Sequence, residues 1–135
     1  MQIASIILSA GKGSRMNSNL PKPFHKIAGE KMIDWVINVN ESLKIDELII
    51  VAPNEQDFSN YNQNYKIAIQ NKANGTGDAV NSTKKYLIAF KGVILICYAD
   101  TPFISKKTLM KLINSVKNGS KIAITCFNKD KKNTY

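Results

Sequence analysis

Five short apolar segments recur along the 135-residue chain, and they are rich in isoleucine, valine and other β-branched residues. Several of them are nearly continuous apolar runs instead of strict alternations, which is typical of strands buried on both faces of a sheet. The predicted strands are residues 3–8, 47–52, 65–69, 93–98 and 122–127.

Between these strands, apolar residues recur three or four positions apart, which places them on one face of a helix. A weaker helix is predicted over residues 77–86. Ser105 is expected to cap the N-terminus of the last helix, which should end before Gly119. The two clear apolar faces consist of Met32, Ile33, Val36, Ile37, Asn40 and Leu43, and of Leu109, Leu112, Ile113 and Val116.

The order of these elements predicts the fold. Strands that alternate with helices indicate an α/β fold, here a Rossmann-like three-layer sandwich with a mostly parallel sheet and right-handed crossovers. A chain of this length is expected to form a single domain over residues 1–135. In such sheets, ligands bind beyond the carboxyl ends of the strands. We therefore expect the loops after the first, third and fourth strands to meet at one edge.

The loop after the first strand combines glycine with positive charge. Gly11 and Gly13 let backbone N–H groups approach phosphate oxygens without a Cβ in the way. Lys12 and Arg15 add positive charge, and Lys22 follows a few residues later. Arg15 is the only arginine of the chain, and a planar guanidinium can bind phosphate through two hydrogen bonds. The loop therefore predicts a triphosphate-binding site.

Two common phosphate-binding motifs do not fit this loop. A P-loop requires a glycine, four further residues and then Gly-Lys-Ser or Gly-Lys-Thr, which the loop lacks. The dinucleotide fingerprint requires a third glycine where Met16 stands, and an acidic residue after the next strand, where residues 51–54 read Val-Ala-Pro-Asn. The pattern that fits is Leu-x-Ala-Gly-x-Gly-Ser/Thr-Arg-Met followed by Pro-Lys, as in sugar nucleotidyltransferases.

Four separate segments carry the same resemblance. Residues 8–16 match the glycine-bearing loop, and residues 20–29 read Leu-Pro-Lys-Pro-Phe-His-Lys-Ile-Ala-Gly. Gln70 is followed by Asn-Gly-Thr-Gly at 74–77, and residues 98–102 read Tyr-Ala-Asp-Thr-Pro. Together they resemble the uridyltransferase domain of the bacterial N-acetylglucosamine-1-phosphate uridyltransferase family, within the nucleotide-diphospho-sugar transferase superfamily. The resemblance covers nearly the whole chain.

This resemblance implies transfer of UMP from UTP to N-acetylglucosamine 1-phosphate, with release of pyrophosphate and Mg²⁺ as cofactor. By the same resemblance, Arg15 would lie along the departing β and γ phosphates, and Lys22 would stabilise charge at the α-phosphorus. Asp100, a hard carboxylate at a strand end, is expected to bind the Mg²⁺, and Gln70 and Gly75 would pair with the uracil edge. The expected nucleotide-binding residues are Leu8, Ala10, Gly11, Lys12, Gly13, Ser14, Gln70, Gly75, Thr76 and Tyr98.

The chain differs from this family at two positions, and it is shorter than the family's proteins. Ala99 stands where the family usually has glycine, and Asp78 stands where histidine is common. The sequence stops before the family's sugar-binding segments, its second metal ligand and the left-handed β-helix that carries acetyl transfer, so acetyl transfer is not expected. A cytidylyltransferase of the same fold and a nucleotide-binding module without turnover stay open as alternatives.

Charge and composition narrow the expected partners. The formal net charge is +9, from nineteen basic and ten acidic residues. The lysine pairs are spread along the chain without interleaved aromatic residues that would stack on bases, so no nucleic-acid partner is expected. No apolar run approaches the roughly twenty residues that cross a bilayer, and no secretion signal is recognisable. We therefore expect no membrane partner and a cytoplasmic location.

The two cysteines lie inside apolar segments. In that setting a thiol behaves as a small core residue, so we expect both Cys97 and Cys126 to be buried and reduced, which agrees with the cytoplasm. The predicted strand around Cys126 would end the sheet with an open edge. Such an edge can pair with another chain, which raises the prospect of a homo-oligomer.

Overall fold

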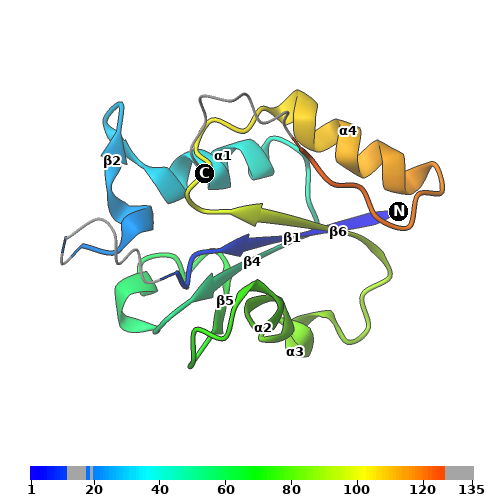
Figure 1. Ribbon diagram of the computed structural model, residues 1–135. Helices are drawn as coiled ribbons and strands as arrows, with labels where there is room; N and C mark the ends of the chain where they lie inside the picture. The colour runs from blue at the N-terminus through cyan, green and yellow to red at the C-terminus, as the bar shows by residue number, and fades with distance from the viewer. Residues whose placement is uncertain (12–17, 19, 127–135) are drawn as a thin grey trace.

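The computed structural model describes residues 1–11, 18 and 20–126 of the chain (Figure 1). The main strands and helices follow the order that the sequence predicts for an α/β fold, and a short pair of strands is added before the first helix. The strands are β1 Gln2–Leu8, β2 Lys26–Ile27, β3 Glu30–Lys31, β4 Glu47–Ala52, β5 Lys66–Ile69 and β6 Gly92–Tyr98. The helices are α1 Met32–Glu41, α2 Thr76–Asn81, α3 Lys84–Leu87 and α4 Lys106–Lys117, with short 3-10 helices η2 Lys22–Phe24 and η3 Gln56–Phe58.

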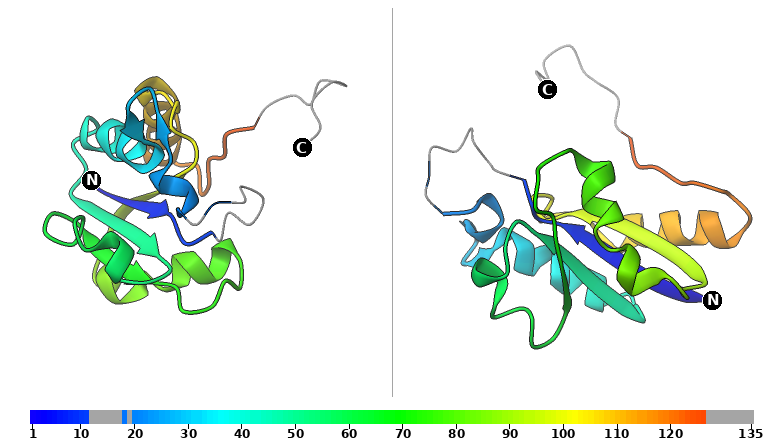
Figure 2. Two further views of the ribbon diagram at one scale, coloured as in Figure 1. Left: turned by 90° about the vertical axis from the view of Figure 1, so that its left-hand side faces the viewer. Right: turned by 90° about the horizontal axis from the view of Figure 1, so that it is seen from below.

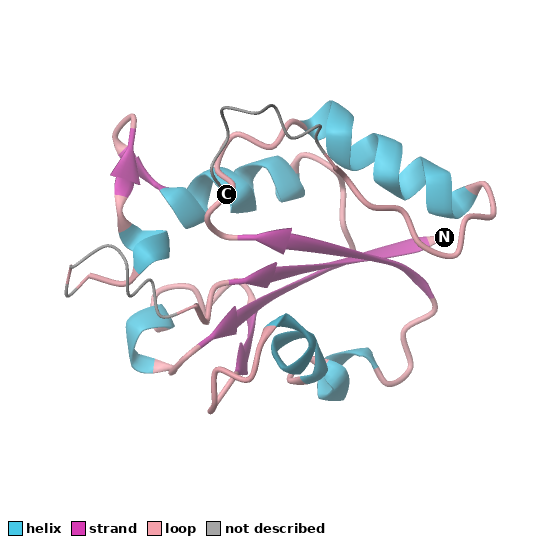
Figure 3. Cartoon of the chain, viewed as in Figure 1, coloured by secondary structure: helices cyan, strands magenta, loops and turns pink. Residues whose placement is uncertain are grey.

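Four strands form a parallel sheet in the order β5-β4-β1-β6. The arrows of this sheet run in one direction in Figure 3. Helices α1 and α4 cover one face, and α2 and α3 cover the other, as the perpendicular views of Figure 2 also show. The predicted three-layer sandwich with a mostly parallel sheet is therefore confirmed. Among the described residues, no helix combines the length and the apolar composition that a membrane span requires.

Alternate residues of β1 enter two cores, one on each face of the sheet. Ile7 packs into the cluster under α1 and α4, and Ile6 packs into the cluster under α2 and α3, and both side chains are fully buried. The fully buried Ile49 and Ile50 of β4 divide between the same two clusters. A strand buried on both faces has to be apolar at successive positions, which explains the continuous apolar runs.

A polar contact inside the larger core explains the asparagine on the apolar face of α1. Asn40 and Ser5 are both completely buried. The Ser5 hydroxyl donates a hydrogen bond of 2.7 Å to Asn40 Oδ1, and Asn40 Nδ2 donates one of 2.7 Å to the carbonyl oxygen of Val36. A buried polar group is costly only when it lacks a partner, so this pair fixes α1 against β1 without that cost.

The predicted last strand is not formed. Residues 122–126 are loop, and Ile122 and Ile124 are 76% and 80% exposed, while residue 127 lies outside the described residues. β-Branched residues form a strand only where a neighbouring strand takes up their hydrogen bonds, and no described strand pairs with this segment. The edge of the described sheet beside β1 is instead β6, so the expected association of copies through a strand around Cys126 has no support.

Two smaller expectations also change. Cys97 is buried, and burial raises the pKa of its thiol, but Cys126 is exposed, so only the first cysteine is a core residue. The helix predicted over 77–86 is divided into α2 and α3. At the division, the hydroxyls of Ser82 and Thr83 donate to carbonyl oxygens three residues earlier in the chain, and such bonds compete with the helical ones.

The remaining helix predictions are confirmed. Ser105 caps α4, and its side chain accepts a hydrogen bond of 3.1 Å from the backbone N–H of Thr108. The chain turns away after α4 at Gly119, whose φ of 106° favours glycine. The apolar faces of α1 and α4 pack on the sheet, with Ile33 and Leu109 among the most deeply buried residues.

An aromatic cluster supports η2 at the carboxyl end of the sheet. The rings of Phe24 and Phe58 are 4.9 Å apart, and those of Phe24 and Tyr61 stack at 6.2 Å. The Lys31 ammonium lies 5.1 Å from the centre of the Phe24 ring. Phe58 is completely buried, so this cluster anchors η2 through Phe24.

We predict that Phe58→Ala lowers the free energy of unfolding by about 3–5 kcal/mol, because it leaves a cavity that the neighbouring rings cannot fill. Phe103→Ala is the matched control, since Phe103 is 71% exposed and has one aromatic neighbour. That control should cost less than about 1 kcal/mol. Urea denaturation measures both, and equal costs would contradict the anchoring role of Phe58.

Candidate functional site

The carboxyl ends of the parallel strands meet at one edge of the sheet. Hydrogen bonds continue the sheet just beyond the strands, from Ser9 N to Val51 O at 2.9 Å and from Ala99 N to Leu8 O at 3.0 Å. On the far side, Gln70 N donates to Ala52 O at 2.9 Å. The loops after β1, β5 and β6 therefore leave the sheet at the same edge, as the element order predicts.

A cavity of about 310 Å³ lies at this edge. It brings together nine of the residues that sequence analysis assigns to the site, which come from the ends of strands β1 and β6, the segments that follow β1, β5 and β6, the start of α2, and η2. These nine are Leu8, Ala10, Gly11, Lys22, Gln70, Gly75, Thr76, Tyr98 and Asp100. The other four expected residues, Lys12, Gly13, Ser14 and Arg15, lie outside the described residues. The expected phosphate-binding loop is thus described only at its first residue, Gly11.

Lys22 and Asp100 form an ion pair at the lining of the cavity. Lys22 Nζ lies 2.6 Å from Asp100 Oδ2, although the two residues are 78 positions apart in the chain. Lys22 opens η2, where Pro21 at the N-cap has a φ of −54° and Pro23 and Phe24 are buried. Asp100 follows β6 in a turn in which Thr101 N donates to Tyr98 O. The buried residues of η2 and the turn after β6 therefore place opposite charges at the same point.

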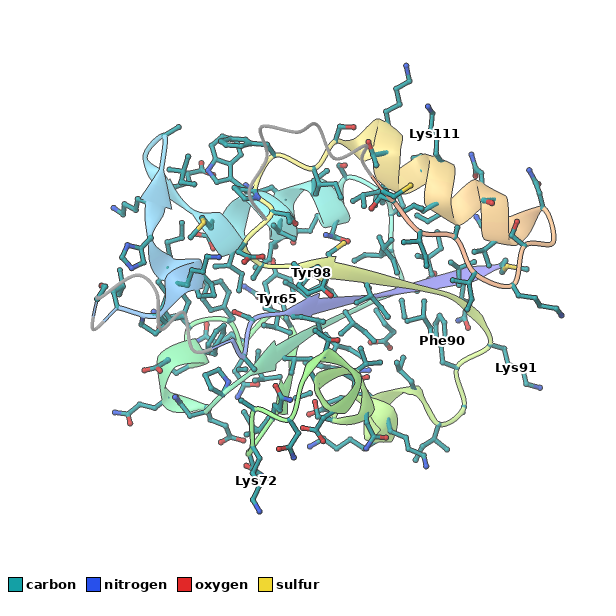
Figure 4. All side chains as sticks on the ribbon, viewed as in Figure 1. Tyr65, Lys72, Phe90, Lys91, Tyr98 and Lys111 are labelled. Carbon is teal, nitrogen blue, oxygen red and sulfur yellow. The ribbon has the colours of Figure 1, made fainter. Side chains whose placement is uncertain are left out.

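The charge at this point is accessible. Each side chain of the pair is 39% exposed, so water reaches both groups. Lys72, which follows β5, projects away from the sheet in Figure 4, as do Lys91 and Lys111 elsewhere. Of the lysines in the described part of the chain, Lys22 is the one that lines the cavity. A phosphate group bound in the cavity would have this cation within the lining.

Gln70 occupies another wall of the cavity. Its side chain is buried, with 8% of the residue exposed. Its amide nitrogen donates two hydrogen bonds, one of 3.0 Å to the carbonyl oxygen of Gly75 and one of 2.9 Å to Asp78 Oδ2. Gly75 has a φ of 98°, a conformation that favours glycine and turns its carbonyl toward Gln70. The amide is held in place from the loop and from α2.

Sequence analysis missed five residues of the cavity wall. Four are small or rigid and carry no reactive group, so no chemical signal marks them: Pro23, Ala73, Ala79 and Ala99. The fifth, Ser9, stands at the variable position of the loop pattern. Its hydroxyl is the one side-chain nitrogen or oxygen in the described part of the chain that is buried without a hydrogen-bond partner. Only the structure reveals this, because burial and pairing depend on the packed fold.

Asp100 can serve as the protein carboxylate for a Mg²⁺ ion whose other ligands are substrate phosphates and water. Within the described residues, no three or more histidine, cysteine, aspartate or glutamate side chains gather as a ligand set. Mg²⁺ commonly binds to one or two carboxylates together with substrate phosphates and water. A single accessible carboxylate in a cavity that also holds Lys22 meets this requirement, whereas a fully protein-ligated metal centre does not fit the described residues.

The fold and the cavity define a nucleotidyltransferase-type α/β domain, and the comparisons agree. Residues 5–134 match the family model of the MobA-like NTP transferase domain. The chain belongs to this family. The sugar nucleotidyltransferase resemblance inferred from the sequence is therefore confirmed at the level of the family.

Within this family, the chain is similar to curated proteins named GlmU. The bifunctional protein GlmU of Paracoccus denitrificans (strain Pd 1222) is 35% identical over 115 residues, which cover 82% of this chain and 26% of that protein. The chain spans roughly a quarter of the length of the curated relatives it matches.

Solved structures support the fold. The structure of Rv0371C from Mycobacterium tuberculosis H37Rv in complex with manganese has a TM-score of 0.70 at 14% identity, covering 87% of this chain and 61% of that one. CMP:2-keto-3-deoxy-manno-octonic acid synthetase complexed with CTP has a TM-score of 0.66 at 19% identity, covering 88% of this chain and 48% of that one.

We predict that Asp100→Asn changes the free energy of unfolding by less than about 1 kcal/mol, because an ion pair this exposed is screened by water. Chemical denaturation of the variant and of the natural chain at equal ionic strength measures the difference. A loss above about 2 kcal/mol would mean that the pair holds the fold together and would remove the case for an accessible binding group.

Proposed function

We propose that this domain transfers UMP from UTP to a sugar 1-phosphate, N-acetylglucosamine 1-phosphate, and releases pyrophosphate. The observation that carries the proposal is the Lys22–Asp100 pair in the same cavity as Gln70, Gly75 and Thr76. Membership of the NTP transferase family and relatives named GlmU support this reaction over other uses of the fold. The chain spans only part of those relatives, so their substrates are assigned here as a proposal.

The reaction joins two anions. A phosphate oxygen of the sugar 1-phosphate forms a bond to the α-phosphorus of the triphosphate, and the bond from the α-phosphorus to the oxygen bridging to the β-phosphorus breaks. Pyrophosphate leaves with that electron pair. No covalent enzyme intermediate is required, so the protein has to neutralise charge and align the reacting groups.

We assign a role in this reaction to individual residues of the site. Lys22 stabilises the charge that develops at the α-phosphorus, and Asp100 is the protein ligand for Mg²⁺. When bound, the metal ion neutralises phosphate charge and helps to orient the triphosphate. The loop beginning at Gly11 would contribute backbone N–H groups, and Arg15 would accompany the leaving pyrophosphate. The assigned roles of Lys12, Gly13, Ser14 and Arg15 remain predictions.

Base recognition is assigned to Gln70, Gly75 and Thr76, which line the same cavity as the ion pair. Tyr98 also lines the cavity, at the end of β6. A cytidylyltransferase is the nearest alternative within the fold, because one structural neighbour is a CMP-sugar synthetase in complex with CTP. A nucleotide-binding module without turnover is the alternative outside catalysis.

The setting of the reaction is also part of the proposal. The product class, a nucleotide-activated amino sugar, fits the synthesis of cell-wall precursors in the cytoplasm. We also propose that the protein can self-associate through the edge strand β6 of the described sheet. Two apolar side chains of this strand are exposed, Ile94 at 47% and Ile96 at 45%.

We predict that Lys22→Ala lowers pyrophosphate release from UTP, N-acetylglucosamine 1-phosphate and Mg²⁺ by at least about 100-fold, because one charge-stabilising group at the reacting phosphate is lost. Lys72→Ala is the matched control and should keep the natural rate within about twofold, since Lys72 projects away from the sheet. A coupled pyrophosphate assay measures both.

The alternatives give different results in the same set of experiments. Equal rates for Lys22→Ala and the natural chain would remove the proposed role of this lysine. Faster turnover with CTP than with UTP would identify a cytidylyltransferase. Calorimetric binding of UTP with no pyrophosphate release, even at high protein concentration, would identify a binding module.

A further inference from the structure

The side-chain amide of Gln70 is held in one orientation. Its nitrogen donates to Gly75 O at 3.0 Å and to Asp78 Oδ2 at 2.9 Å, so both N–H groups are used. A backbone carbonyl and a carboxylate can only accept hydrogen bonds. If the amide were turned over, its own oxygen would face two acceptors in a largely buried position, which is strongly unfavourable.

This orientation leaves the amide oxygen free. Within the described residues, Gln70 Oε1 has no hydrogen-bond partner, and it is not among the side-chain atoms that are buried without one. Gln70 lines the cavity. The side chain therefore presents a hydrogen-bond acceptor to the cavity and withholds its donors from it.

A lone acceptor distinguishes between pyrimidine bases. Uracil and thymine carry an N–H group at ring position 3, which can donate to such an oxygen. Cytosine has an unprotonated nitrogen at that position, which would face the oxygen as a second acceptor. A glutamine free to turn over would serve either base, because it could offer oxygen to one and nitrogen to the other.

We infer that Asp78 is a positioning residue for base selection: it fixes the amide of Gln70 so that the cavity accepts a pyrimidine with an N–H group at position 3 and disfavours cytosine. The inference rests on the proposed function, since it names the nucleotide class for the same site. Asp78 acts through Gln70, and it stands on the first turn of α2, with its side chain half-buried.

The lining of the cavity around the proposed base contact includes small apolar side chains. Ala73 and Ala79 line the same cavity as Gln70. The charged groups Lys22 and Asp100 are paired with each other, and neither is a hydrogen-bond partner of Gln70 or Asp78. A change at Asp78 therefore alters base contacts and leaves the phosphate-binding pair intact.

Equilibrium binding of UTP, dTTP and CTP to three chains tests the inference: the natural protein, Asp78→Ala and Asp78→Asn. The Kd ratio of CTP to UTP should fall at least about fivefold in Asp78→Ala, since one of the two contacts that orient the amide is lost. Asp78→Asn retains an acceptor oxygen and should keep the ratio within about twofold of the natural value. The natural protein should bind dTTP more tightly than CTP.

The outcomes separate this inference from the proposed reaction. An unchanged CTP-to-UTP ratio in Asp78→Ala, or an equal weakening for both nucleotides, would overturn the positioning role while the transfer reaction stands. Selective UTP binding that is lost in Asp78→Ala, with no pyrophosphate release by the natural chain, would support the role and overturn the reaction. Binding of CTP as tightly as UTP by the natural protein would overturn the inference directly. Circular dichroism of each variant establishes that it is folded.

Discussion

The parallel pairing of β1 with β4 and β6 is the constraint on which the site depends. Leu8 lies level with Val51 on one side and Tyr98 on the other. Because the strands run in the same direction, their following loops emerge together. The buried hydrogen bond from Ser5 to Asn40 also depends on this register, since a slip of one residue would turn Ser5 to the opposite face of the sheet.

This sheet edge gathers charges that contribute little to stability. The aromatic cluster under η2 holds Lys22, and the turn after β6 holds Asp100. Each residue is therefore positioned independently of their ion pair. Their ion pair is exposed to water, and pairs of this kind typically contribute less than about 1 kcal/mol to stability. A charged group that its own backbone positions, and that forms only a weak ion pair, can exchange its partner for a phosphate or a metal ion at a small cost in free energy.

The pattern of apolar residues correctly predicted those strands and helices whose formation depends only on burial against the sheet. The continuous apolar runs of β1 and β4 and the apolar faces of α1 and α4 each follow from packing against the sheet. Residues 122–126 have the same composition as a strand but no described partner, so their pattern misled the prediction. The order of elements also predicted that Asp100 would lie near Gln70. It could not predict the hydrogen bond from Gln70 to Asp78, because that bond depends on side-chain rotamers and on the turn at Gly75.

The two parts of the proposed site, the Lys22–Asp100 pair and the amide of Gln70, would act on a nucleotide by different physics. At Lys22 and Asp100 the interaction is between net charges, which acts over several ångströms and distinguishes poorly between nucleotides that share a triphosphate. At Gln70 the interaction is a single hydrogen bond, which acts only at contact and depends on which atom donates. Discrimination between bases therefore has to come from an oriented dipole, and an amide is useful for this only when its orientation is fixed. The carboxylate of Asp78 accepts one of the two hydrogen bonds that orient the amide, and it does so from helix α2, outside the loop that carries Gly75.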